Sequence, residues 1–256
     1  GASIVLQDSA DAASTLDAVE RHAATVHYGI PTVFVAGLAL LKERSWALDS
    51  LRLALISGAP VRDELMLEVA ECMDVTVIAG YSVTETASTV SASRSSDPAD
   101  KRRFTVGTPI ANTEVRIVDI DRVELPEESV GEIRVKGLGV MMGYYRQPKV
   151  TAESFDEDGF FRTGDLGLVD EEGYLHLVGR TKDVIIRSGF NVYPREVEAR
   201  IESHPAVREV AAVGVADALL GEAICACFVP DEGAIVTGHK VVDWCRGHSR
   251  MTRFPI

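Results

Sequence analysis

Cysteine is scarce in this sequence, which has four in 256 residues and no C-x-x-C pair. That spacing does not favour a disulfide framework or a cysteine metal site. Cys225 and Cys227 would share one face of a strand, because side chains alternate along a strand. We therefore predict that all four, Cys72, Cys225, Cys227 and Cys245, are small buried hydrophobic residues.

Basic residues are also in deficit, since 26 Lys and Arg stand against 39 Asp and Glu, for a formal net charge of −13. A field of that sign repels phosphate backbones and anionic lipid, so we expect no nucleic-acid partner. A small anionic substrate would have to be held by local donors, such as oriented backbone N–H groups and single cations.

Long hydrophobic runs and targeting features are missing as well. The longest uncharged apolar stretch, residues 29–41, is shorter than the roughly 18 to 20 residues that span a bilayer. The first residues lack the basic region and apolar core of a secretory signal. We expect no transmembrane helix and an intracellular, cytoplasmic location.

The composition that is present is typical of a globular protein, with 46% hydrophobic and 25% charged residues. At roughly 150 residues per domain, the length allows one large domain or two unequal ones. No internal repeat or low-complexity tract is visible.

The first part of the chain alternates helical and strand patterns. Helical spacing of apolar residues covers 14–26, 31–41 and 61–73, the second of these beginning at a proline. Short apolar runs at 51–56 and 75–79 predict buried strands. Such an order indicates a parallel sheet with a right-handed crossover, in which ligands bind beyond the carboxyl ends of the strands.

The pattern changes after these elements. Residues 91–103 are polar, and we interpret them as an exposed loop in which the three basic residues Lys101, Arg102 and Arg103 form a solvated face. Short alternating segments then predict a small antiparallel β layer at 114–118, 132–135 and 174–178. Beyond Arg180 we expect a compact α+β unit, with helices at 194–202 and 236–245 and strands at 207–215 and 224–229.

Gly80-Tyr81-Ser82-Val83-Thr84-Glu85 follows the strand at 75–79, and we expect a turn there. Tyr81 offers an aromatic face for a base, Thr84 a hydroxyl for a phosphate, and Glu85 an oxygen ligand for Mg²⁺. Read by itself, the string is more often a polar loop with a surface tyrosine and an acidic helix cap.

Ser57-Gly58-Ala59-Pro60 ends the preceding strand, and a doubly wound sheet would bring it beside the Tyr81 string. Small residues there would let a flat heterocycle lie against the backbone. A simple strand-to-helix turn is the more common explanation of this string alone.

Two later strings also carry polar groups suited to a nucleotide. Asp165, in Thr163-Gly164-Asp165, can accept hydrogen bonds from two ribose hydroxyls, and Arg180 can reach ribose or phosphate oxygens. Lys182 lies between two predicted structural units, where a hinge residue would absorb a change in backbone φ and ψ angles. Each string has an ordinary alternative, a turn at Gly-Asp and an exposed linker with a salt bridge at 179–183.

Together these strings resemble the adenylate-forming superfamily, and within it the acyl-CoA and aryl-CoA ligases. The similarity runs through nearly the whole chain, on motifs in matching order and spacing: Gly143-Tyr144-Tyr145, Thr151, Gly159-Phe160-Phe161-Arg162-Thr163-Gly164-Asp165, Gly173-Tyr174, Gly179-Arg180-Thr181-Lys182-Asp183 and Ser188-Gly189-Phe190-Asn191-Val192-Tyr193-Pro194-Arg195-Glu196-Val197-Glu198. Weak motifs become specific in such a series, because chance matches would have to coincide.

The resemblance implies an α/β fold in two parts. Residues 1–179 would be the later part of a large AMP-binding domain, with a parallel sheet, helices and a small β layer. Residues 180–256 would be a truncated α+β C-terminal domain that rotates on a hinge near Lys182.

The resemblance also implies an ATP-dependent acid–thiol ligase. A carboxylic acid would attack the α-phosphate of ATP with Mg²⁺, giving acyl-AMP and pyrophosphate, and coenzyme A would then take the acyl group and release AMP. The implied nucleotide contacts are Gly58, Ala59 and Pro60 on the adenine side, Gly80, Tyr81 and Ser82 at the adenine ring, Thr84 at phosphate, Glu85 at Mg²⁺, and Asp165 and Arg180 at ribose. Ser188 and Gly189 would line the tunnel for the pantetheine arm. The implied catalytic residues are Thr84, Glu85 and Lys182.

The sequence departs from the family pattern in three ways. It contains neither the Ser/Thr/Gly-rich phosphate loop ending in Pro-Lys-Gly nor the lysine of the adenylation step, although residues 251–256 resemble the segment shortly before that lysine. We therefore expect a fragment that cannot make acyl-adenylate by itself. Ser82 replaces a common glycine, and its Cβ is expected to narrow the acyl pocket.

Two other functions stay open. A peptide-synthetase adenylation domain would use the same Tyr81 and Asp165 motifs, but residues 182–189 favour the CoA ligases. A non-catalytic AMP-binding or interaction module is the other alternative, although such a module has no physical reason to keep a metal ligand. Tyr28, Val33 and Phe34 suggest an apolar acid, but a helix with such residues is more often simply core.

Overall fold

The structure is a computed structural model that describes residues 1–9 and 11–247. The chain forms two compact units. The first comprises Gly1–Thr163 and Gly167–Leu177, and the second comprises Gly164–Leu166 and the chain from Val178 onward. Residues 251–256, which resemble the segment before the family lysine, lie outside the described part.

The first unit begins with alternating helices and strands. In chain order these elements are α1 (Ala12–His22), β1 (Val26–Gly29), α2 (Pro31–Glu43), β2 (Leu53–Ser57), α3 (Asp63–Met73) and β3 (Thr76–Val83). β1, β2 and β3 are parallel neighbours, so the predicted parallel pair of β2 and β3 is confirmed. β1 was not predicted, because the predicted first helix extended to residue 26, whereas α1 ends at His22. Two antiparallel strands, β4 (Ser88–Ala92) and β5 (Thr108–Pro109), complete a five-stranded sheet in the order β1-β2-β3-β4-β5.

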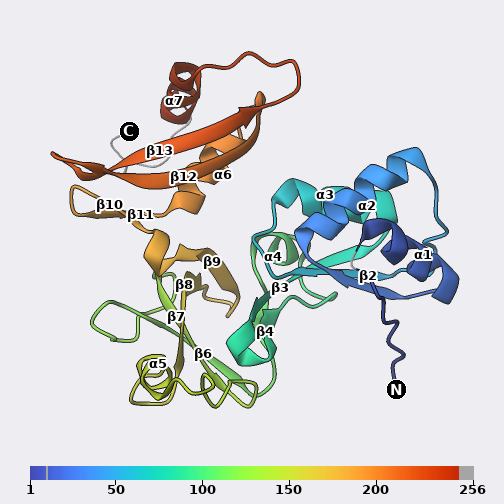
Figure 1. The fold of residues 1–256 in the computed structure, drawn as a ribbon, viewed down its shortest axis with the longest axis horizontal. Helices are drawn as coiled ribbons and strands as arrows, with labels where there is room; N and C mark the ends of the chain where they lie inside the picture. Colours follow the sequence, from blue (N-terminus) through green and yellow to red (C-terminus); the bar gives the residue numbers. More distant parts are fainter. Residues whose placement is uncertain (10, 248–256) are drawn as a thin grey trace. The chain divides into compact units, whose positions relative to one another are not determined.

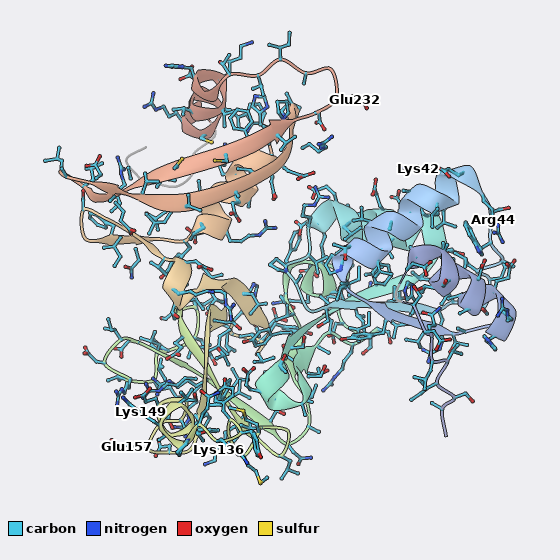
Figure 2. All side chains as sticks on the ribbon, viewed as in Figure 1. Lys42, Arg44, Lys136, Lys149, Glu157 and Glu232 are labelled. Atoms are coloured by element: carbon cyan, nitrogen blue, oxygen red, sulfur yellow. The ribbon has the colours of Figure 1, made fainter. Side chains whose placement is uncertain are left out.

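Local chemistry explains where these helices begin and end. The Asp11 side chain caps α1 by accepting a hydrogen bond from the Ser14 backbone N–H across 2.8 Å. Pro31 occupies the first turn of α2, where its missing N–H costs nothing. Lys42 and Arg44 lie at the other end of α2 (Figure 2), where positive charge stabilises the helix dipole.

One buried cluster of the first unit lies between this sheet and the helices α2 and α3 (Figure 1), and α1 contributes Leu16 and Val19 to it. Phe34, Ile56 and Val69 are fully buried within it, one each from α2, β2 and α3. Burial of one such side chain is worth roughly 1.5–3 kcal/mol, so this cluster fixes how the helices sit on the sheet.

Only the middle of residues 91–103 is the exposed loop that the sequence suggested: residues 94–98 lie in neither a helix nor a strand and are mostly exposed. Ser91 and Ser93 are buried, and their hydroxyls donate hydrogen bonds to the carbonyl oxygens of Val106 and Ala79, respectively. A short helix, α4 (Ala99–Phe104), follows them. The three basic residues are half-buried in that helix rather than solvated. A serine hydroxyl that donates its hydrogen bond to a backbone carbonyl oxygen can be buried at little cost, which is why part of this polar segment lies in the interior.

The predicted turn at residues 80–85 is also wrong. β3 continues to Val83, because β4 pairs with it in antiparallel fashion, with an irregular register between Tyr81 and Ser82. The chain turns only at the short 3₁₀ helix η1 (Thr84–Thr86). The apolar run predicted a strand that ends at residue 79, but pairing with β4 extends β3 to Val83.

A second sheet in the order β6-β7-β8-β9 confirms the predicted small β layer. Its strands are β6 (Thr113–Val118), β7 (Gly131–Gly137), β8 (Phe161–Val169) and β9 (Leu175–Arg180), and α5 (Pro148–Glu153) lies between β7 and β8 in the chain. β6 and β7 are antiparallel. The sequence had not predicted β8, whose alternation is interrupted at Gly164.

The second unit has a four-stranded sheet in the order β11-β10-β13-β12. Its elements are η2 (Thr181–Asp183), β10 (Ile185–Arg187), β11 (Phe190–Val192), α6 (Pro194–Glu202), β12 (Val207–Asp217), β13 (Gly221–Pro230) and α7 (Gly238–Gly247). The last four are the two predicted helices and the two predicted strands. Ile201 of α6 and Val241 of α7 share one buried cluster with β12 and β13, which holds these elements together.

The cysteines only partly match their predicted burial. Cys245 is buried, Cys225 is half-buried, and Cys72 and Cys227 are exposed. All four are free thiols. Within residues 1–9 and 11–247, no helix is long and apolar enough to cross a membrane.

Candidate functional site

The carboxyl end of β2 lies beside Gly80 of β3. Ser57 pairs with Gly80 in the parallel register, so Gly58, Ala59 and Pro60 follow directly from the strand beside the Tyr81 string, as predicted. The Ser57 hydroxyl oxygen lies 2.8 Å from the Gly80 carbonyl oxygen and 3.2 Å from the Ser82 hydroxyl oxygen. These hydroxyls therefore tie the end of β2 to β3, at the edge where a parallel sheet ordinarily binds ligands.

Tyr81 lies in the interior of the first unit. Its side chain is 6% exposed and packs in a cluster with Val90, Ile117 and Ile133. Much of the ring that the family resemblance assigns to adenine is thus covered by its own unit. Stacking on adenine stays a prediction for this residue.

Thr84 and Glu85 occupy η1, directly after β3. Thr84 is exposed, and Glu85 is half-buried. Just beyond them, Ala87 and Ser88 have backbone φ angles of 53° and 93°. Non-glycine residues in this region cost roughly 1–2 kcal/mol each, so the surrounding structure must hold this bend in place.

Glu85 is held by a partner that the sequence had not singled out. The Tyr144 hydroxyl donates a hydrogen bond to Oε1 of Glu85 across 2.8 Å. Burial and this carboxylate both raise the pKa of Tyr144, so its phenol stays protonated and acts as the donor. The only sequence signal was the position of Tyr144 in the Gly143-Tyr144-Tyr145 motif.

The residues around Glu85 fit a magnesium ion that is shared with phosphate groups. In the described part of the chain, no three His, Cys, Asp or Glu side chains are grouped as a metal site. Mg²⁺ is usually held by one or two carboxylates together with substrate phosphates and water. A single half-buried carboxylate such as Glu85 meets that requirement, whereas a site made of protein ligands alone does not form here.

Asp165 and Arg180, both predicted at ribose, lie in the second unit and contact each other. Arg180 Nε donates to Asp165 Oδ1 across 2.8 Å, and the Asp165 side chain is only 16% exposed. Gly164 has a φ of 71°, which a side chain rarely adopts, and this bend interrupts β8 next to Asp165. The Thr181 hydroxyl donates to the Gly164 carbonyl oxygen across 3.1 Å, so η2 is fastened to the same bend.

Ser188 and Gly189 form the two-residue turn between β10 and β11. Arg187 pairs with Phe190, and the φ angles of Ser188 and Gly189 are 51° and 83°. Two positive φ angles define the hairpin turn that matches strand twist, and glycine is favoured there. The glycine therefore has a conformational reason besides the predicted close approach of a pantetheine arm. Lys182 is exposed in η2.

A surface pocket of about 550 Å³ in the first unit is lined by none of these residues. Its lining residues are Leu38, Leu41, Lys42, Ser45, Trp46, Leu48, Asp49, Leu51, Cys72, Met73 and Asp74. None of them is a predicted site residue. The pocket lies beside α2 and the end of α3 rather than at the strand ends.

Comparison with known proteins identifies the family. Residues 1–145 match the family model described as AMP-binding enzyme. The chain belongs to the AMP-binding enzyme family. Residues 196–254 match the AMP-binding enzyme C-terminal domain, so both matches agree with the predicted resemblance.

Relatives in this family are named as acyl-CoA ligases and synthetases. The chain is 35% identical over 260 residues to the mitochondrial medium-chain acyl-CoA ligase ACSF2 of Mus musculus, covering 99% of this chain and 42% of that protein. It is 37% identical over 246 residues to a feruloyl-CoA synthase of Amycolatopsis sp, covering 96% and 50%. The chain thus spans about half or less of the length of these relatives.

A solved structure shows the same fold. ATP-bound MatB from Rhodopseudomonas palustris matches with a TM-score of 0.84 and 35% sequence identity, covering 94% of this chain and 47% of that one. The α/β fold class predicted from the sequence is therefore confirmed.

Proposed function

We propose that the protein to which this chain belongs is an ATP-dependent, AMP-forming acid–thiol ligase that makes acyl-CoA. The main support is one observation in a chain of the AMP-binding enzyme family. Ser57 at the end of β2 pairs with Gly80 of β3, so the Gly58-Ala59-Pro60 string lies beside the strand that leads to Glu85. Relatives named as CoA ligases support the choice of a thiol acceptor over a peptide-synthetase reaction.

In the first half-reaction, a carboxylate oxygen of the acid attacks the α-phosphorus of ATP, and pyrophosphate leaves. Negative charge accumulates on the phosphate, so catalysis depends on oriented donors and positive charge. In this proposal Thr84 contacts phosphate, and Gly58, Ala59, Pro60, Gly80, Tyr81 and Ser82 surround adenine. Glu85 would hold Mg²⁺, which supplies charge neutralisation at the phosphates.

In the second half-reaction, the thiol of coenzyme A attacks the acyl carbonyl carbon, and AMP leaves. Asp165 and Arg180 would hold the ribose hydroxyls, since their ion pair orients the carboxylate. Ser188 and Gly189 would border the path of the pantetheine arm. We place the domain boundary at residue 180 and the hinge near Lys182, in the exposed helix η2.

We propose that the acid is apolar, because the relatives are named for a medium-chain acyl group and for a feruloyl group. The test is a panel of aliphatic and aromatic acids given to the protein expressed from its complete gene, with ATP, Mg²⁺ and coenzyme A. Acyl-CoA and AMP should form together from at least one acid. Absence of AMP formation with every acid would refute the ligase proposal. A cytoplasmic location stays a prediction from the sequence.

We also propose that the 256-residue chain alone does not make acyl-adenylate, because its sequence contains no Pro-Lys-Gly phosphate loop. Pyrophosphate release by the chain alone should stay at background, while the protein from the complete gene releases it. Turnover at a comparable rate by both would show that the missing loop is not needed.

A further inference from the structure

The segment after β7, residues 138–145, docks on η1 through three contacts. The Met141 backbone N–H donates to the Glu85 carbonyl oxygen across 2.8 Å, and the Tyr144 hydroxyl donates to Glu85 Oε1 across 2.8 Å. Gly139 lies so close that a Cβ there would be 2.7 Å from the Thr86 carbonyl oxygen. Two of the three contacts are made to Glu85 itself, one to its backbone and one to its side chain.

Tyr144 is in turn fixed by α5. The Tyr144 backbone N–H donates to the Thr151 hydroxyl oxygen across 2.9 Å. The preceding Gly143 packs against the same side chain, since a Cβ there would lie 2.5 Å from Thr151 Cγ2. The phenol therefore reaches Glu85 from an anchored backbone rather than from a loose loop.

This arrangement affects how Glu85 can bind a cation. A glutamate side chain has several rotatable bonds, and ordering it on binding a ligand costs conformational entropy. A hydrogen bond to one carboxylate oxygen orders the group before the ligand arrives. Partners of this kind orient metal-binding side chains in many proteins, and their loss weakens metal affinity by about 10–100-fold.

We propose that Tyr144 is a positioning residue that orients the Glu85 carboxylate to bind the magnesium ion carried by ATP. The inference rests on the proposed function, because it takes Glu85 as the metal ligand. Tyr144 acts through Glu85 and need not touch the nucleotide.

The neighbouring tyrosine provides a matched control. Tyr145 lies in the same motif but is 82% exposed, and its ring contacts the neighbouring Arg146 guanidinium. Tyr144→Phe and Tyr145→Phe each remove one hydroxyl from the same segment. They differ in whether that hydroxyl is bonded to Glu85.

The experiment uses the protein expressed from its complete gene and Mn²⁺ as a spectroscopic probe. Electron paramagnetic resonance measures the Kd of Mn²⁺ in the presence of an ATP analogue with a methylene bridge between the α- and β-phosphates. We expect Tyr144→Phe to raise this Kd about tenfold or more, and Tyr145→Phe to leave it within about twofold. Glu85→Gln should raise the Kd too, and adding Tyr144→Phe to it should have no further effect.

Several results would overturn the proposal. Equal Kd values for the two phenylalanine variants would do so, as would a Tyr144→Phe variant that loses thermal stability but keeps the wild-type Kd. A wild-type protein that binds no Mn²⁺ with the analogue would remove Glu85 as a metal ligand and the role of Tyr144 with it. An additive effect of Tyr144→Phe on Glu85→Gln would show that Tyr144 does not act through Glu85.

A second variant tests the anchor if Tyr144→Phe does not fold. Thr151→Ala removes the hydroxyl that accepts the Tyr144 N–H, and it should raise the Mn²⁺ Kd severalfold, whereas Thr151→Ser should restore it. An unchanged Kd in Thr151→Ala would count against the proposal. Acyl-CoA formation by the wild-type protein is measured separately. If acyl-CoA forms but the two phenylalanine variants have equal Mn²⁺ Kd values, only the role of Tyr144 is refuted. If Tyr144→Phe weakens Mn²⁺ binding but no acyl-CoA forms, only the ligase function is refuted.

Discussion

Lys101 Nζ lies 2.7 Å from Asp170 Oδ2, so helix α4 is bound to the connection between β8 and β9. The Asp170 side chain is only 9% exposed, and both of its carboxylate oxygens make further contacts. Its Oδ1 accepts the backbone N–H groups of Glu172 and Tyr174, and its Oδ2 also contacts His176 Nε2 at 3.1 Å. One carboxylate thus organises the whole turn.

We predict that Asp170→Asn destabilises the protein by about 1–3 kcal/mol at pH 7, because buried donors lose a charged acceptor. Burial alone would raise the pKa of Asp170, but hydrogen bonds, with that of Lys101 first, hold it below its ordinary value of 3.8. The carboxylate therefore stabilises the fold above that value, and the stabilisation is lost as the pH falls below it.

Urea unfolding of wild type and Asp170→Asn between pH 7 and pH 3 measures this effect. The difference between the two should narrow as the pH falls below about 4. Glu172→Gln is the control, because that side chain is 65% exposed, and it should cost less than about 1 kcal/mol. A difference that does not change with pH would argue against the ionised carboxylate as the source.

His27 predicts a second pH dependence. It is 6% exposed and packs on the Phe34 ring at a centroid distance of 4.4 Å, and neither ring nitrogen has a hydrogen-bond partner among the described residues. Burial lowers the pKa of His27 from its ordinary 6.5. The unfolded chain therefore binds the proton more tightly, and stability should fall as the pH drops below 6.5.

Replacing His27 should remove that dependence. We expect His27→Leu to raise the free energy of unfolding at pH 7 by about 1 kcal/mol, because an unpaired buried polar group is lost. Unfolding curves at pH 7.5 and pH 5.5 should differ less for this variant than for wild type. His22→Gln, on the exposed end of α1, serves as the control. A variant with undiminished pH dependence would show that His27 is not the responsible group.

Asp165→Ala tests the proposed ribose contact. The change removes the carboxylate that Arg180 orients, and AMP binding should weaken by about tenfold, equal to roughly 1.4 kcal/mol of a charge-assisted contact. Titration calorimetry with AMP measures it. Glu171→Ala removes an exposed acid of the β8–β9 connection and should leave the affinity unchanged. Equal affinity in Asp165→Ala and wild type would remove Asp165 from the site.

Gly189→Ala separates the two half-reactions. Its φ of 83° makes alanine cost roughly 1–2 kcal/mol of stability, although, apart from its chain neighbours, no residue among 1–9 and 11–247 would have a heavy atom within 4 Å of the new Cβ. Gly233→Ala is a matched control, with a φ of 78° and equally open surroundings. Only Gly189→Ala should slow acyl transfer to coenzyme A, while adenylation measured by pyrophosphate exchange stays normal in both. Equal transfer rates in the two variants would contradict the pantetheine path.

Elements with a strong local signal could be predicted from the sequence. Pro31 and Pro194 each precede apolar residues at helical spacing, and α2 and α6 begin at these prolines. Strands of three residues, such as β10 and β11, carry too little alternation to be recognised. The motifs identified the family, and with it the candidate residues, because their order and spacing survive without knowledge of the fold.

The sequence by itself determined the family, the main helices and the parallel strands β2 and β3, since periodicity and motif order are properties of residues close together in the chain. Only the tertiary structure decided that Tyr144 donates to Glu85, 59 residues away, and that Lys101 pairs with Asp170 across 69 residues. It also extended β3 past Tyr81 and buried Ser91. Contacts between distant segments depend on how strands pair and helices pack, and no local pattern encodes them.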